Sequence, residues 1–197
     1  EQFAEDIGNA MGRSTYALQK YTSDIGSIFK GLGGIADEDI KKMSEDLATL
    51  AVDIGSFKNI ADDRVFTAIT AGIVGETEPL KRLGIVINET TMAEYALTKG
   101  IKVKWEALDQ ATKAQLRYQK IMESTAFMQG DAARTINTYA NQLKVFQANT
   151  QELTKALGDK FVNSANGVLQ VINKVTDGLT KFFNRKDSSD FINTAMQ

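Results

Sequence analysis

The stretch VGETEPLKRLGIVI, residues 74–87, decides how this chain is divided, because it contains the only proline of the sequence. On both sides of this stretch, apolar residues recur with the period of a helix. Gly75 can end the upstream helix with a positive φ, Thr77 or the following glutamate can cap a new helix, and Pro79 suits a first helical turn. Gly84 then stands where that helix should close. The stretch therefore predicts one short helix with sharply defined ends.

Two short segments near this helix show strand signals. Residues 85–87, Ile-Val-Ile, are all β-branched, and residues 101–104, Ile-Lys-Val-Lys, alternate apolar with charged side chains. Between them, Asn88, Thr90 and Thr91 are candidate caps for a helix that should end at Gly100. The pattern predicts a short two-stranded β-ribbon beside that helix.

The composition argues against several classes of function. The net charge is −2 and the isoelectric point is near 5.3, whereas nucleic-acid-binding surfaces usually carry an excess of basic residues. The chain has neither cysteine nor histidine, so it lacks thiol nucleophiles, the commonest metal ligands and the commonest general base. We therefore expect no enzyme, no cofactor, no specific nucleic-acid partner, and no catalytic, cofactor-binding or metal-ligating residue.

The first segment, residues 1–35, has apolar residues at alternating intervals of four and three, which predicts one amphipathic helix. One position of this spacing is occupied by a polar residue, Ser14. Glycines at 31, 33 and 34 should end the helix in a glycine-rich linker. The apolar positions are Ile7, Met11, Leu18, Tyr21, Ile25 and Ile28.

The second segment, residues 36–130, predicts a compact domain of several helices. Three acidic residues at 37–39 precede an apolar stripe that continues to Phe57, and Asp62 precedes another stripe. Acidic residues favour the first turn of a helix, because they complement its dipole. Asp109 is the candidate cap of a further helix.

The third segment, residues 131–197, predicts a long amphipathic arm with a polar tail. One continuous helix from residue 131 to residue 183 would be roughly 80 Å long, so we expect either a protruding arm or an oligomerisation helix, in one piece or broken at Gly158. Thr150 interrupts the heptad-like stripe. Its apolar members are Ile136, Tyr139, Leu143, Phe146, Leu153, Leu157, Phe161, Ala165, Val168, Ile172, Val175, Leu179 and Phe182. The expected fold class is mostly α: a compact multi-helix domain, the β-ribbon, and long heptad-patterned C-terminal helices.

Six stretches, in consistent order over about residues 36–158, carry a family resemblance. They are LAVDIGSFKNI at 50–60, GETEPLKRLGI at 75–85, YALTKG at 95–100, LRY at 116–118, QGDAART at 129–135 and ANQ at 140–142. Together they closely resemble the conserved domain of tail tape measure proteins of long-tailed bacteriophages and prophages. Members of that family are usually much longer, and this chain starts and stops without a capping or turn signal. We therefore expect a segment of a longer protein.

The resemblance implies a structural protein of the virion, found in the tail lumen or at the tail tip and made in the cytoplasm of the bacterial host. Such proteins occupy the tail tube, determine tail length during assembly and leave ahead of the DNA at infection. The implied partners are the tube, tail-tip and tail assembly chaperone proteins. No functional residue is carried over, because Gly75, Pro79 and Gly84 resemble turn residues and Asp131 resembles a helix cap.

Two further expectations concern partners. The narrow apolar stripes and the mixed charges of the polar faces favour protein contacts, including self-association through the heptad-patterned helices. The alternative is a helical membrane-interacting or pore-forming module that contacts the host envelope during DNA ejection. Within the leading interpretation, residues 36–130 are interrupted by too many turns to measure length, so we expect an attachment or tail-tip module.

Overall fold

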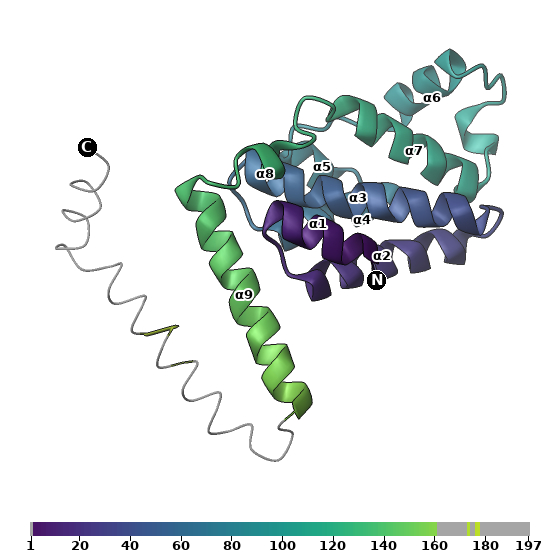
Figure 1. The fold of residues 1–197 in the computed structure, drawn as a ribbon. Coiled ribbons are helices and arrows are strands. Elements are labelled where there is room, and N and C mark those ends of the chain that lie inside the picture. The colour runs from purple at the N-terminus through teal and green to yellow at the C-terminus, as the bar shows by residue number, and fades with distance from the viewer. Residues whose placement is uncertain (1, 161–172, 174–175, 178–197) are drawn as a thin grey trace. The chain divides into compact units, whose positions relative to one another are not determined.

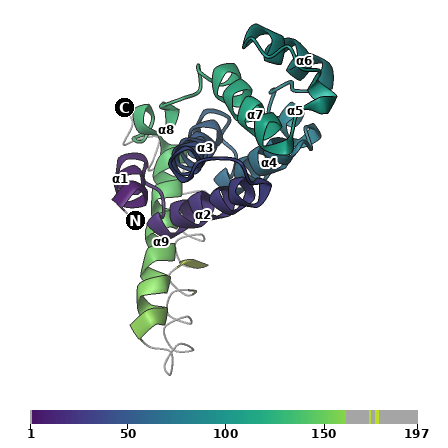
Figure 2. The same ribbon diagram turned by 90° about the vertical axis from the view of Figure 1, so that its right-hand side faces the viewer.

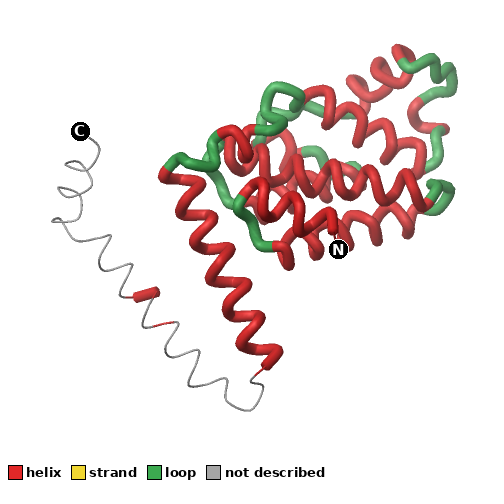
Figure 3. Tube along the Cα trace, in the orientation of Figure 1, coloured by secondary structure: helices red, strands yellow, loops and turns green. Residues whose placement is uncertain are grey.

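The computed structural model describes residues 2–160, 173, 176 and 177, and the protein is mostly helical there (Figures 1 and 3). The chain divides into two units, Glu1–Ala148 and Asn149–Gln197, and the first is a compact multi-helix unit. This confirms the predicted fold class at the level of a compact, mostly helical domain. The compact unit contains the helices α1 to α8 and the beginning of α9, whereas the division into residues 1–35, 36–130 and 131–197 stays a prediction.

The described helices follow one another with short connections. In sequence order they are α1 (Gln2–Met11), α2 (Thr15–Leu32), α3 (Asp37–Phe57), α4 (Asp62–Val74), α5 (Glu78–Arg82), α6 (Glu89–Thr98), the 3-10 helix η1 (Trp105–Ala107), α7 (Gln110–Ser124), α8 (Asp131–Arg134) and α9 (Tyr139–Lys160).

Helix α3 forms the centre of the compact unit. It packs against α1, α2, α4, α7 and α8, and Figure 2 shows these helices around it. Its apolar stripe is removed from water, with Leu47 and Ile54 both at 0% exposure. Phe29 of α2 and Ile69 of α4 are equally buried in the same core. Each such side chain stabilises the fold by about 1.5–3 kcal/mol.

Several of the helix ends that the sequence predicts are confirmed. Gly75 ends α4 in the left-handed region with φ 109°, and Pro79 lies in the first turn of α5. The Asn88 side chain accepts a hydrogen bond from the Thr91 N–H at 2.9 Å and caps α6. Asp109 caps α7 in the same way. These signals act within four residues of the helix end, so the local sequence is sufficient to identify them.

The predicted β-ribbon is wrong, because neither of its two segments forms a strand. Both instead complete the end of a helix. Gly84 and Gly100 adopt positive φ, and the N–H groups of Ile85 and Ile101 each donate to a carbonyl five residues earlier at 3.0 Å. These bonds satisfy carbonyls at the ends of α5 and α6. Ile85 and Ile87 then enter the core without a partner strand, whereas Val86 and Val103 are 57% and 53% exposed.

The single N-terminal helix is also a wrong prediction, since the chain turns between α1 and α2. Gly12 has φ 61°, and a Cβ atom there would lie 2.3 Å from the Val145 side chain. Ser14, instead of occupying the stripe of one helix, accepts a hydrogen bond from the Ala17 N–H at 3.2 Å and caps α2. Gly12 supplies the positive φ of this turn, and its lack of a side chain leaves room for Val145.

The third correction concerns the start of the C-terminal helix. No continuous helix runs from Asp131, because α8 ends at Arg134 and α9 begins only at Tyr139. Helix α9 then continues through Gly158 to Lys160. The part of the heptad stripe that begins at Phe161 lies outside the described residues.

Candidate functional site

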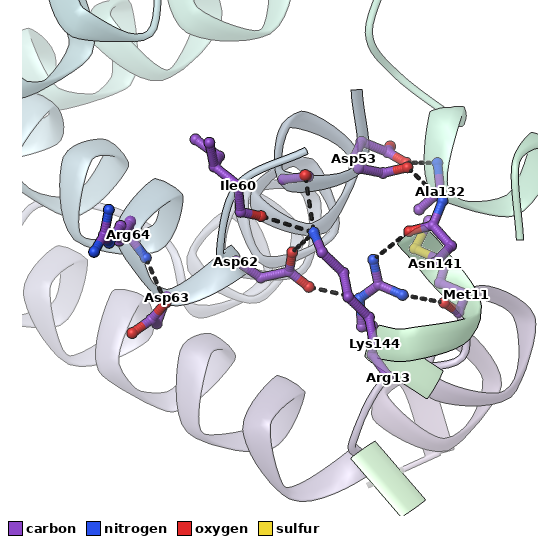
Figure 4. A network of polar contacts seen from close by, with 12 residues as sticks. Met11, Arg13, Asp53, Ile60, Asp62, Asp63, Arg64, Ala132, Asn141 and Lys144 are labelled. Carbon is purple, nitrogen blue, oxygen red and sulfur yellow. Dashed lines mark hydrogen bonds and ion pairs between the residues drawn. The ribbon is translucent and has the colours of Figure 1, made fainter. Parts of the chain in front are cut away.

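A buried network of polar side chains, here called the polar junction, joins parts of the compact unit that are distant in sequence (Figure 4). It connects the turn before α2 with α3, the start of α4, α8 and the start of α9. Its members are Arg13, Asp53, Ser56, Asp62, Asp131, Thr135, Asn141 and Lys144.

Asp62 lies between two cations at one end of the junction. Its carboxylate is 2.6 Å from Arg13 Nε and 2.8 Å from Lys144 Nζ, and the three side chains are only 7–15% exposed. The Lys144 ammonium also donates to the carbonyls of Gly55 at 2.8 Å and Ile60 at 2.7 Å. Lys144 therefore uses three hydrogen-bond partners to hold the start of α9 against the end of α3 and the start of α4.

Gly55 makes this arrangement sterically feasible. A Cβ atom at this position would lie 2.2 Å from Asp62 Oδ1 and 3.3 Å from the Asp62 Cα. Since real Cβ atoms essentially never approach other atoms so closely, a side chain would push α3 away from α4. The glycine thus allows the carboxylate to lie beside the backbone that Lys144 also contacts.

Asp53 forms the second part of the junction. It is 2% exposed on α3, and its carboxylate accepts the N–H of Gly130 at 2.7 Å and the N–H of Ala132 at 3.1 Å. Burial raises the pKa of Asp53, although the two N–H donors act in the opposite direction. Asp53 thereby fixes the turn before α8 on the central helix.

Ser56 and Asn141 connect these two parts. The Ser56 hydroxyl donates to Asp131 Oδ2 at 2.7 Å, and Asn141 Nδ2 donates to Ser56 Oγ at 2.9 Å. Arg13 Nη2 donates to Asn141 Oδ1 at 3.0 Å. In these bonds each partner of Ser56 is another member of the junction, which is the arrangement of a structural network.

Asp131 does not cap a helix, contrary to the role that the resemblance implies. The capping position of α8 is Gly130, with φ 76°, and no side-chain hydrogen bond caps this helix. The Asp131 carboxylate instead accepts the Ser56 hydroxyl from α3. The position serves tertiary structure and not a local helix start.

A second contact joins the turn after α4 to α7. Arg117 Nη1 donates to the carbonyl of Ile73 at 3.1 Å. A Cβ atom at Gly75 would lie 2.9 Å from Arg117 Nη2, so the guanidinium packs directly on the glycine backbone. Arg117 thus supplies a cation at the C-terminal end of α4, whose last turn contains no basic residue.

The sequence prediction identified no site residue and missed the junction. One signal was present, because Asp53 directly precedes Ile54 in the buried stripe of α3, where a charge needs partners. Arg13 and Lys144 offered no comparable signal, since isolated basic residues are usually solvated. Their partner Asp62 is 49 and 82 residues away in sequence.

In the part of the protein that the structure describes, no three acidic, histidine or cysteine side chains gather as a metal ion would require. Among the same residues, no helix combines the length and the apolar character needed to cross a membrane.

No protein-family model, curated protein or solved structure matches this chain.

Proposed function

We propose that this chain is a segment of a tail tape measure protein of a long-tailed bacteriophage or prophage, with a role in tail assembly and tail length determination. Within that protein the compact unit acts as an attachment or tail-tip module, and the segment has no enzymatic role. Its place is the virion, after synthesis in the host cytoplasm, and its partners are the tube, tail-tip and assembly chaperone proteins.

The main support comes from where the six stretches of the resemblance lie. The stretch at 50–60 contains Asp53 and Ser56, which bond to residues of the stretches at 129–135 and 140–142. The stretch at 75–85 begins with Gly75, against which Arg117 of the stretch at 116–118 packs. Stretches far apart in sequence thus meet in space, as expected if they resemble one family domain as a unit.

The way the helices fold favours an attachment module over a chain that measures tail length. A ruler needs length in residues to map onto length in space, as an extended helix does at about 1.5 Å per residue. In the compact unit, successive helices instead fold back onto α3. Residues arranged in this way add little to an axial length, so the measuring part belongs elsewhere in the proposed parent protein.

Self-association is proposed through α9. Its apolar side chains Tyr139, Leu143 and Leu153 are 65%, 43% and 52% exposed, whereas Asn141 and Ala148 on its other side are buried. These exposed positions belong to the heptad-like stripe, which favours a helical partner. The membrane-interacting alternative makes a different prediction, namely flotation of the purified protein with vesicles that contain anionic lipid.

Tail length in electron micrographs tests the proposal. In one variant, the parent gene carries an in-frame deletion of the codons for residues 36–130. In a second variant, the deletion removes the whole unit, residues 1–148. We expect absent or aberrant tails from both variants, because an attachment module would be missing. Normal-looking tails shortened by about 1.5 Å per deleted residue would show that the region measures, and would overturn the module. Virions with unchanged tails from both variants would overturn the role in assembly.

A further inference from the structure

A pocket of about 200 Å³ opens between the turn after α4, the start of α6 and helix α7. Its walls include Gly75, Thr77, Asn88, Glu89, Trp105 and Arg117. The pocket is separate from the polar junction, with which it shares no residue.

Arg117 provides the charge in this pocket. Its guanidinium packs against the Gly75 backbone, and its Cζ atom lies 5.4 Å from the centre of the Trp105 ring. Within the described residues, no carboxylate oxygen lies within 4.0 Å of this side chain. Desolvation lowers the pKa of Arg117, as expected for a cation that is partly removed from water and has no close counter-ion.

The cap on α4 uses only part of the guanidinium. An arginine carries five N–H donors in a planar fork, and the described contact of Arg117 engages Nη1 with the Ile73 carbonyl. No buried side-chain nitrogen in the described part of the protein lacks a partner. The Arg117 nitrogens that make no hydrogen bond to the described residues are therefore not fully buried, and Arg117 lines the pocket. A planar anion in the pocket would find N–H donors on this side chain.

Size and charge define the chemistry of the occupant. At roughly 30 Å³ per water, the pocket holds about seven waters, and it is smaller than the roughly 300–1,000 Å³ of most sites for drug-sized ligands. It also contains one anion, Glu89, whose charge acts on Arg117. One cation with an anion nearby suits a singly charged carboxylate better than a phosphate dianion.

We propose that this pocket binds a single carboxylate group of a protein partner, with the open edge of the Arg117 guanidinium as its anchor. The carboxylate comes from an acidic side chain or from the C-terminus of a polypeptide, since both present the same planar group. The proposal does not depend on the tape measure assignment.

Trp105 makes the test direct, because it is the only tryptophan of the sequence and it lines the pocket. The 197-residue chain would be titrated with N-acetylglycine, which has a terminal carboxylate, and with the α-amide of N-acetylaspartate, which has a side-chain carboxylate. N-acetylglycinamide is the neutral control, and inorganic phosphate is the competing anion. We expect a saturable change in tryptophan emission with one or both carboxylates, and the stronger response identifies the source.

Two variants locate the binding. Arg117→Lys keeps the positive charge but loses the fork, and should weaken carboxylate binding by about tenfold, the value of one charge-assisted hydrogen bond. Glu89→Gln keeps Arg117 intact and removes the like charge, so it should bind the same probe several-fold more tightly; far-UV circular dichroism checks that both variants fold. The proposal is overturned if neither carboxylate gives a saturable response, if the neutral amide or phosphate binds as well, or if Glu89→Gln binds no more tightly.

Discussion

Asp53 illustrates how one residue can define a connection between distant segments. Its carboxylate is buried on the central helix, where a charge is unfavourable, and it accepts two backbone N–H groups from the turn before α8. A carboxylate can accept both donors at once, whereas an amide oxygen leaves one of the two sites to its own NH₂ group. The position therefore requires aspartate despite the cost of burial.

The raised pKa of Asp53 predicts a pH dependence with a definite sign. Between the ordinary value of 3.8 and its higher folded-state pKa, the folded protein binds more protons at this position than the unfolded protein. The contribution of Asp53 to stability is therefore greatest at acidic pH and falls as the pH rises through this window. Urea unfolding from pH 3 to pH 7 should show the wild type losing stability relative to Asp53→Asn, by about 1.4 kcal/mol for each pH unit between the two pKa values.

Asp109 is the matched control for this prediction. Hydrogen bonds from the backbone and side chain of Thr112 lower its pKa, so its contribution is present above the ordinary value and is lost as the pH falls. The wild type should accordingly gain stability relative to Asp109→Asn as the pH rises, which is the opposite sign. Parallel pH profiles for the two variants would contradict the assignment to Asp53.

At the scale of elements, the polar junction determines how the beginning of α9 is held. Its contacts there come from Asn141 and Lys144, while Tyr139 and Leu143 remain exposed. The helix is thus anchored by polar bonds on one side and presents apolar side chains on the other. This is why we assign its apolar stripe to a partner and not to the compact unit.

Lys144→Met should destabilise the protein by about 2–4 kcal/mol, because the part-buried Ile60 carbonyl loses its donor and Asp62 loses one of its two cations. The Gly55 carbonyl loses the Lys144 ammonium but keeps the Ile60 N–H. Urea unfolding would measure the change. Lys20→Met is the control, since Lys20 pairs with Asp24 only at the exposed surface, and it should leave the stability nearly unchanged. If both substitutions cost the same, the junction does not hold α9.

At the scale of the whole molecule, the compact unit contains the members of the junction and, among the residues that the structure describes, those of the main apolar core. The last residue of that unit is Ala148, and its core residues lie between Ala4 and Ala148. The stability of this unit should therefore not require the residues after Ala148. That independence is what the proposed module needs if it is to act beside a separate helical part.

A fragment of residues 1–148 should unfold cooperatively in urea with the midpoint of the whole 197-residue chain. A fragment of residues 1–138 is the matched control: it lacks Asn141 and Lys144, so its midpoint should be clearly lower. Circular dichroism measures both. A fragment 1–148 without cooperative unfolding would contradict the independence of the unit.

Most of the helical structure could be predicted from the sequence, because its signals are local. The caps at Asn88 and Asp109, the glycine end of α4 at Gly75 and the acidic start of α3 each depend on hydrogen bonds or dipole interactions within about one helical turn. The residue types at these positions therefore contain the information that the prediction needed.

Tertiary contacts decided the rest. Lys144 bonds to Asp62 across 82 residues of sequence, and Val145 packs directly against the turn at Gly12. The error in the strand prediction was local: Ile85 and Ile101 have suitable β propensity, but their N–H groups each donate to a carbonyl five residues earlier and close the preceding helix. Local preferences amount to less than about 1 kcal/mol per residue, so burial and long-range hydrogen bonds override them wherever the two disagree.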